Sequence, residues 1–117
     1  MTQVIYKKLA NGLPVLNIKT IGLKTATILL VVKTGSKYET KEINGLSHFL
    51  EHVMFKGTSR RPDTLTLASD LDALGGEYNA FTSKEYTGYW IKVENSQFFR
   101  AAEILSDMLL NSKFDAR

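Results

Sequence analysis

The sequence contains no cysteine, and it has only two prolines, one tryptophan and two histidines. Without cysteine the chain forms no disulfide and no thiolate metal site, so its stability must come from an apolar core. The 117 residues are enough to build such a core in a single domain. Any bound metal should therefore serve chemistry rather than folding. The lack of cysteine is also compatible with a reducing compartment.

Long apolar runs are absent as well. The longest, ATILLVV at 26–32, is far shorter than the roughly 18 apolar residues that a membrane-spanning helix requires, and it predicts a buried strand. The first twelve residues lack the charged and apolar regions of a secretory signal. We therefore expect a cytoplasmic protein with no membrane partner.

The excess of one charge sign over the other is small too. Fifteen basic residues are scattered among twelve acidic ones, which leaves a net charge of only +3. No basic stripe exists that would follow a phosphate backbone. The composition therefore argues against a nucleic-acid partner.

Hydrophobic periodicity predicts an α+β fold of two layers, a mainly antiparallel sheet with helices packed on one face. An Asn-Gly pair indicates a hairpin turn between the first two strands. Four leucines of the second helix, Leu65, Leu67, Leu71 and Leu74, are expected on one face. No linker divides the chain, so residues 1–117 should form one domain. We expect strands at 3–8, 13–20, 25–34, 77–83 and 85–93, and helices at 43–56, 62–74 and 95–112.

Both histidines fall in the stretch GLSHFLEHVMFKGT at 45–58, on one predicted helix. Residues four apart lie on the same helical face, so His48 and His52 can bind one ion. Neutral imidazole suits zinc, and a catalytic zinc site has three protein ligands and one open position. Glu51 lies beside the pair, where it can act as the general base that deprotonates the attacking water in peptide hydrolysis.

The spacing leaves two points open. The pair can instead be ordinary histidines that face solvent or are satisfied by hydrogen bonds, and the third metal ligand is not identified. Glu77 and Glu85 are acidic candidates, although carboxylates at strand ends are more often solvated. The segment SRRPD at 59–63 either binds an acidic partner or opens the following helix, with Pro62 in its first turn.

The sequence on either side of the motif adds a resemblance to a protein family. HFLEH at 48–52 fits the His-x-x-Glu-His signature of inverzincins. Together with NGLPV, VVKTGSKYE, LGGEYNAFTSKEYTGYW and LSDMLLNSKF, it resembles the N-terminal portion of the pitrilysin, insulinase and mitochondrial-processing-peptidase family of zinc metallopeptidases. The likeness is strongest to bacterial members similar to the β subunit of the processing peptidase, and it runs across nearly the whole chain.

This resemblance implies a role for each motif residue. His48 and His52 correspond to zinc ligands, and Glu51 corresponds to the catalytic base. The third ligand of the family is a later glutamate, whose position would fall beyond Arg117. Family members are also far longer, so we expect residues 1–117 to be the truncated N-terminal part of a peptidase half-domain, inactive alone.

The resemblance also implies a substrate-binding strand. In the family the strand that corresponds to GGEYNAFTS lies at a sheet edge beside the metal, and the peptide adds to it as a further strand. Asn79, Ala80 and Phe81 would line that edge. From the residues alone, an ordinary amphipathic strand with apolar core positions is the simpler interpretation.

Two functions from different classes follow. The first is a zinc-dependent metalloendopeptidase that cleaves peptides or presequence-like segments. The alternative is a non-catalytic scaffold or binding subunit of a peptidase complex. The intact motif favours the enzyme. Apolar surface left uncovered should favour self-association, so we expect a homo-oligomer or a heterodimer with a homologous subunit.

Overall fold

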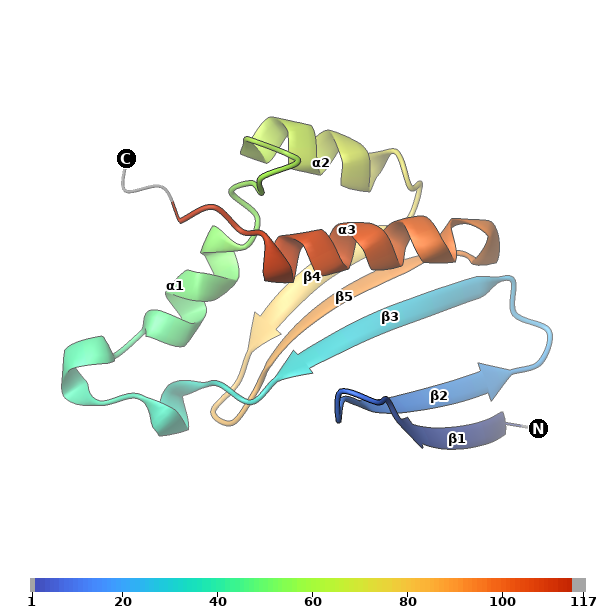
Figure 1. The fold of residues 1–117 in the computed structure, drawn as a ribbon, viewed down its shortest axis with the longest axis horizontal. Helices are drawn as coiled ribbons and strands as arrows, with labels where there is room; N and C mark the ends of the chain where they lie inside the picture. Colours follow the sequence, from blue (N-terminus) through green and yellow to red (C-terminus); the bar gives the residue numbers. More distant parts are fainter. Residues whose placement is uncertain (1, 115–117) are drawn as a thin grey trace.

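The computed structural model describes residues 2–114 and confirms the predicted α+β class (Figure 1). Short 3₁₀ turns precede the first and third helices. None of the helices within this part of the chain is long and apolar enough to cross a membrane. The elements are β1 (Thr2–Lys8), β2 (Pro14–Thr20), β3 (Thr25–Val32), α1 (Leu46–Val53), α2 (Thr64–Asp72), β4 (Glu77–Thr82), β5 (Thr87–Glu94) and α3 (Phe98–Leu110).

The larger sheet has three antiparallel strands in the order β3-β5-β4. Alternation along β5 turns Tyr89, Ile91 and Val93 toward the helices, where all three are buried. The long helix α3 lies across this face of the sheet (Figure 1). Its buried residues supply the other half of the core: Ala101, Ile104, Leu105 and Met108. Strand β4 is left at one edge of the sheet.

Helix α2 packs on α3 through three of the four leucines expected on one face. Leu67, Leu71 and Leu74 are buried, whereas Leu65 is 80% exposed, so its placement in the core was wrong. The three buried leucines follow helical spacing, but Leu65 lies only two positions before Leu67. Two positions are about 200° around a helix of 3.6 residues per turn, which turns Leu65 to the opposite side.

The second helix also begins later than predicted. Asp63 is its N-cap and accepts a hydrogen bond from the backbone N–H of Thr66 at 2.7 Å. Pro62 therefore precedes the cap instead of lying in the first turn. An aspartate at this position satisfies an N–H group that has no partner within the helix, so the cap fixes the start.

Helix α1 is shorter than the predicted span of 43–56. At its start Gly45 has φ +87°, which separates the helix from the 3₁₀ turn at Lys41–Ile43. At its end, Phe55 and Lys56 bond to carbonyls only three residues back, so the chain tightens before Gly57. The motif His-x-x-Glu-His lies entirely within the regular part of α1.

Strands β1 and β2 form a separate two-stranded sheet that the helices do not cover (Figure 1). The register pairs Val4 with Ile18 and Tyr6 with Leu16, which puts all four on one face. Each of these side chains is between 57% and 66% exposed. We refer to these four residues as the hairpin stripe. The described residues leave this apolar surface bare, which the predicted two-layer arrangement did not anticipate.

Candidate metal centre

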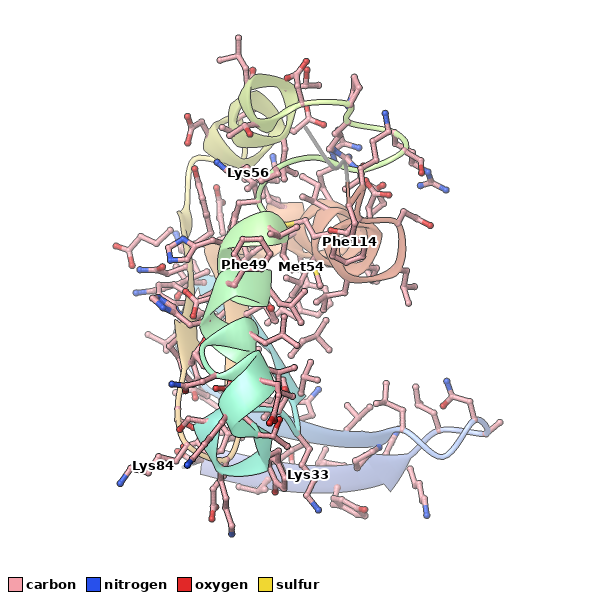
Figure 2. The ribbon with its side chains drawn as sticks, turned by 90° about the vertical axis from the view of Figure 1, so that its left-hand side faces the viewer. Lys33, Phe49, Met54, Lys56, Lys84 and Phe114 are labelled. Atoms are coloured by element: carbon pink, nitrogen blue, oxygen red, sulfur yellow. The ribbon has the colours of Figure 1, made fainter. Side chains whose placement is uncertain are left out.

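The predicted site lies where α1 runs beside the edge strand β4. Figure 2 shows α1 on the outside of the molecule, with Lys84 of the β4–β5 turn toward one end of the helix and Lys56 beyond the other end. Phe49 lies on the outward side of the helix and is 62% exposed (Figure 2). The site is therefore at the surface, open to a large substrate.

The two histidines converge as the spacing predicts. Both are exposed, and their Nε2 atoms lie 3.1 Å apart. Two nitrogens bound to one tetrahedral zinc at the usual bond length are separated by roughly 3.3 Å, so the pair fits one ion with little adjustment. Among residues 2–114, no group of three or more metal-binding side chains gathers around one point. The structure thus offers two nitrogens for a metal, and their role as ligands stays a prediction.

Glu51 lies on the same helix and is half-buried. Its Oε2 accepts a hydrogen bond from the hydroxyl of Thr82 at the end of β4. Burial, together with the negative charge of Glu51, raises the pKa of the nearby Tyr89 hydroxyl. The carboxylate is therefore held between the helix and the sheet and points toward the strand that borders the site.

A second carboxylate holds the start of α1. The Oε2 of Glu39 accepts a hydrogen bond from the N–H of Gly45 at 2.7 Å, and its Oε1 accepts one from the N–H of Ser47 at 2.9 Å. These bonds, that of Ser47 first, lower the pKa of Glu39. A negative charge at this position also interacts favourably with the positive end of the helix dipole. The residue directly after Ser47 is His48, so Glu39 fixes the turn that carries the first histidine.

A groove of about 590 Å³ lies between the start of α1 and the β4–β5 turn. The segment that contributes Ser36 to the groove is hydrogen-bonded to the β4–β5 turn, because the N–H of Lys37 donates to the carbonyl of Lys84 at 2.8 Å. Gly35 is required at this contact, since a Cβ there would lie 2.4 Å from the carbonyl oxygen of Ser83. The groove is lined by Ser36, Glu39, Asn44, Gly45, His48, Glu51, Phe81, Thr82, Ser83 and Lys84.

The predicted substrate strand is β4, and the structure places it at the sheet edge, as expected. The N–H of Ala80 is bonded to the side-chain oxygen of Asn79 at 2.8 Å rather than to β5, so it points to the free edge. Asn79 and Phe81 are exposed on the sheet face away from α3, and Ala80 is half-buried. Phe81 also lines the groove.

Of the two arginines in the segment SRRPD, Arg61 is not available to an acidic partner outside the chain. Arg61 is 5% exposed, and it donates to Asp70 at 2.6 Å, Glu103 at 2.9 Å and Asp107 at 2.6 Å. The hydroxyl of Thr58 donates to the same Asp107 at 2.6 Å. This network, which we call the Arg61 cluster, joins the loop after α1 to α2 and α3.

The Arg61 cluster favours the ionised form of Glu103 and Asp107. The hydrogen bond from Arg61 is the main reason that the pKa of Glu103 is lowered. Burial works to raise the pKa of Asp107, but the hydrogen bonds that it accepts outweigh burial and hold this pKa below its usual range. The cluster is a structural support away from the histidines.

Two site residues, Glu39 and Thr82, were missed from the sequence. The Thr82 contact joins residues 31 positions apart, and the Glu39 contacts reach only six and eight positions ahead. In both cases the residue itself, a carboxylate in a polar loop or a threonine at a strand end, carries no local signal of its partner. The other acidic candidates are not near a metal position: Glu77 is exposed, and Glu85 pairs with Lys37 at 2.9 Å.

Comparison with known proteins first finds relatives that are named as zinc proteases and processing peptidases. The chain is 44% identical over 105 residues to a Bacillus subtilis (strain 168) protein named uncharacterized zinc protease YmxG, covering 90% of this chain and 25% of that protein. It is also 44% identical over 107 residues to mitochondrial-processing peptidase subunit beta of Dictyostelium discoideum, covering 92% of this chain and 23% of that subunit.

A comparison with protein families then identifies the particular family. Residues 15–117 match the model described as Insulinase (Peptidase family M16), and the chain belongs to this family. The family predicted from the sequence is thereby confirmed. The chain spans about a quarter of the length of these two relatives.

Proposed function

We propose that this chain carries part of the active site of a zinc-dependent endopeptidase, in which His48 and His52 bind the metal and Glu51 is the general base. The observation that carries the proposal is the convergence of the two Nε2 atoms at 3.1 Å, with the Glu51 carboxylate fixed beside them by Thr82. Family membership and relatives named zinc proteases support the metal and the reaction class.

Each part of the proposed site has a separate role in the reaction. Bound zinc would polarise the scissile carbonyl and lower the pKa of water. Glu51 would take the proton from the attacking water and later give it to the leaving amine, since both transfers occur on the same side of the peptide. One carboxylate oxygen is bonded to Thr82, which leaves the other to accept that proton.

We propose that the substrate lies along β4. The outward N–H of Ala80 and the free edge of this strand suit the main chain of an extended peptide, which would add as a further antiparallel or parallel strand. Binding then requires the Asn79 side chain to release the N–H of Ala80. Phe81, which is 38% exposed, would contact a substrate side chain at the entrance of the groove. Peptides or presequence-like segments remain the proposed substrates.

Two ligands alone hold zinc weakly, so we propose that a third, a glutamate, comes from outside these 117 residues. The isolated chain should then bind zinc in rapid exchange and show no hydrolysis. We further propose a homologous partner subunit, in keeping with the relatives named as a β subunit, and a cytoplasmic location that cell fractionation would test.

The decisive test replaces Glu51 with Gln in the active assembly of the protein. Glu51→Gln should retain zinc, measured by metal analysis, while hydrolysis of a quenched fluorescent peptide falls by at least about a hundredfold. Glu85→Gln is the matched control, because Glu85 is an exposed carboxylate of the β4–β5 turn that pairs with Lys37 and does not line the groove. Unchanged turnover in Glu51→Gln would remove it as the base. Peptide binding without hydrolysis in the unsubstituted protein would instead favour the scaffold role.

A further inference from the structure

The last residue of β4, Thr82, reaches across to α1. Its hydroxyl donates to Oε2 of Glu51, thirty-one positions earlier in the sequence. Its neighbour across the strands, Thr87, has a different partner and donates to the backbone carbonyl of Thr34 at 3.1 Å. Thr82 and Thr87 are paired across the two strands, but their hydroxyls bond to different segments. Of the two, only Thr82 contacts the carboxylate of the proposed base.

The Glu51 side chain would otherwise be free to turn. A glutamate that is only half-buried on a helix surface samples several rotamers, and each unproductive one takes the carboxylate away from the water that it must deprotonate. A hydrogen bond to one oxygen removes that freedom while it leaves the second oxygen available. General bases depend on such orientation, because misplacement by about 1 Å can cost on the order of a hundredfold in rate.

We propose that Thr82 is a positioning residue that orients Glu51 for proton transfer. This inference rests on the proposed function, since it requires that Glu51 be the base. The side-chain hydrogen bond that the Thr82 hydroxyl donates goes to Glu51, so Thr82 acts through Glu51.

The location of Thr82 adds a second consequence. It follows Ala80 and Phe81 on β4, the strand along which the substrate is proposed to lie. One side chain thus joins the peptide-binding strand to the base on α1. This hydrogen bond adds to the packing of α1 on β4 in setting the distance between the scissile bond and the base.

The test compares three variants in the active assembly, with steady-state kinetics and zinc analysis. Thr82→Val keeps the shape but removes the donor, and it should lower kcat about ten- to a hundredfold while KM and zinc content change less than about twofold. Thr82→Ser restores a hydroxyl and should recover kcat to within about threefold of the parent. Thr87→Val is the matched control, because it removes a neighbouring strand hydroxyl that does not touch Glu51, and its kcat per folded protein should be unchanged.

Several results would overturn the proposal: an unchanged kcat in Thr82→Val, a serine variant as impaired as the valine variant, or a loss explained by lost zinc. Should Thr82→Val not fold, the comparison of Thr82→Ala with Thr82→Ser decides in the same way. A Glu51→Gln variant in the same assay separates the two claims. If Glu51→Gln is active, the proposed base is wrong; if it is inactive while Thr82→Val is fully active, only the positioning role is wrong.

Discussion

At the scale of single residues, the start of α1 depends on a side chain that is not part of the helix. Helix termini leave backbone N–H groups without partners, and here no residue of the helix itself caps them. The carboxylate of Glu39 accepts hydrogen bonds from two of these N–H groups, those of Gly45 and Ser47. The direction of the first helical turn, and with it the position of His48, is therefore set from the preceding loop.

Replacement of Glu39 should reveal this dependence. Glu39→Ala is expected to lower the thermal midpoint of the protein and to weaken zinc binding, because the turn that carries His48 loses both acceptors. Thermal unfolding followed by circular dichroism and competition with a zinc-sensitive dye measure the two effects. Glu42→Ala is the control, since Glu42 is an exposed carboxylate in the same loop. Equal effects in both variants would show a general charge effect instead of a specific cap.

The motif residues could be predicted from the sequence because their relation is local. Four positions along a helix bring two imidazoles together whatever the rest of the fold does, so His48, His52 and the adjacent Glu51 follow from spacing alone. The contact of Thr82 depends on how β4 and α1 meet, which no short-range pattern encodes. The contacts of Glu39 span only six and eight positions, but a glutamate in a polar loop does not by itself indicate them. The third metal ligand could not be predicted from the spacing either, and the described residues supply none.

At the scale of elements, the loop after α1 is held by charge in addition to the apolar contacts that Met54 and Phe55 make with the core. The Arg61 cluster buries a guanidinium among three carboxylates, and Asp107 is only 2% exposed. Removing one member of such a cluster leaves uncompensated buried charge, which costs far more than the net value of the intact pair.

We therefore expect Arg61→Leu to lower the free energy of unfolding by about 3–5 kcal/mol, measured by urea denaturation. The neighbouring Arg60 gives a control within the same segment, because it pairs with the same Glu103 but its side chain is 67% exposed. Arg60→Leu should cost less than about 1 kcal/mol. A loss in Arg61→Leu as small as that of Arg60→Leu would mean that the Arg61 cluster contributes little to stability.

Most elements could also be predicted, because alternation and helical spacing are strong along this chain. The failures have local physical causes. Leu65 was expected on the same face as Leu67, Leu71 and Leu74 although its angle around α2 turns it outward, and the ends of α1 are set by Gly45 and a tightened last turn. The segment SRRPD was expected either to bind an acidic partner or to open the following helix, and its sequence did not indicate the burial of Arg61, which three carboxylates from distant segments make possible.

At the scale of the whole molecule, the bare hairpin stripe is the feature most in need of a partner. Two-stranded sheets are at best marginally stable alone, and the stripe presents four adjacent apolar side chains to solvent. In the 117-residue chain they remain available for association.

The isolated 117-residue chain should accordingly self-associate, as measured by light scattering across a range of concentrations. The double variant Tyr6→Lys with Leu16→Glu places two charges on the hairpin stripe and should shift the chain toward monomer. Gln3→Lys with Asn17→Glu is the matched control on the opposite face of the same hairpin. A clean monomer at high concentration in the unsubstituted chain would contradict this expectation.

The central claim is that His48 and His52 hold one zinc ion between them. It is tested most directly by diffraction from crystals of the active protein grown with zinc, with anomalous data collected at the zinc absorption edge. We predict a single anomalous peak roughly 2.0–2.1 Å from the Nε2 atoms of both residues, with the Glu51 carboxylate beside it. No peak between the two rings, or a zinc ion bound by only one of them, would contradict the account.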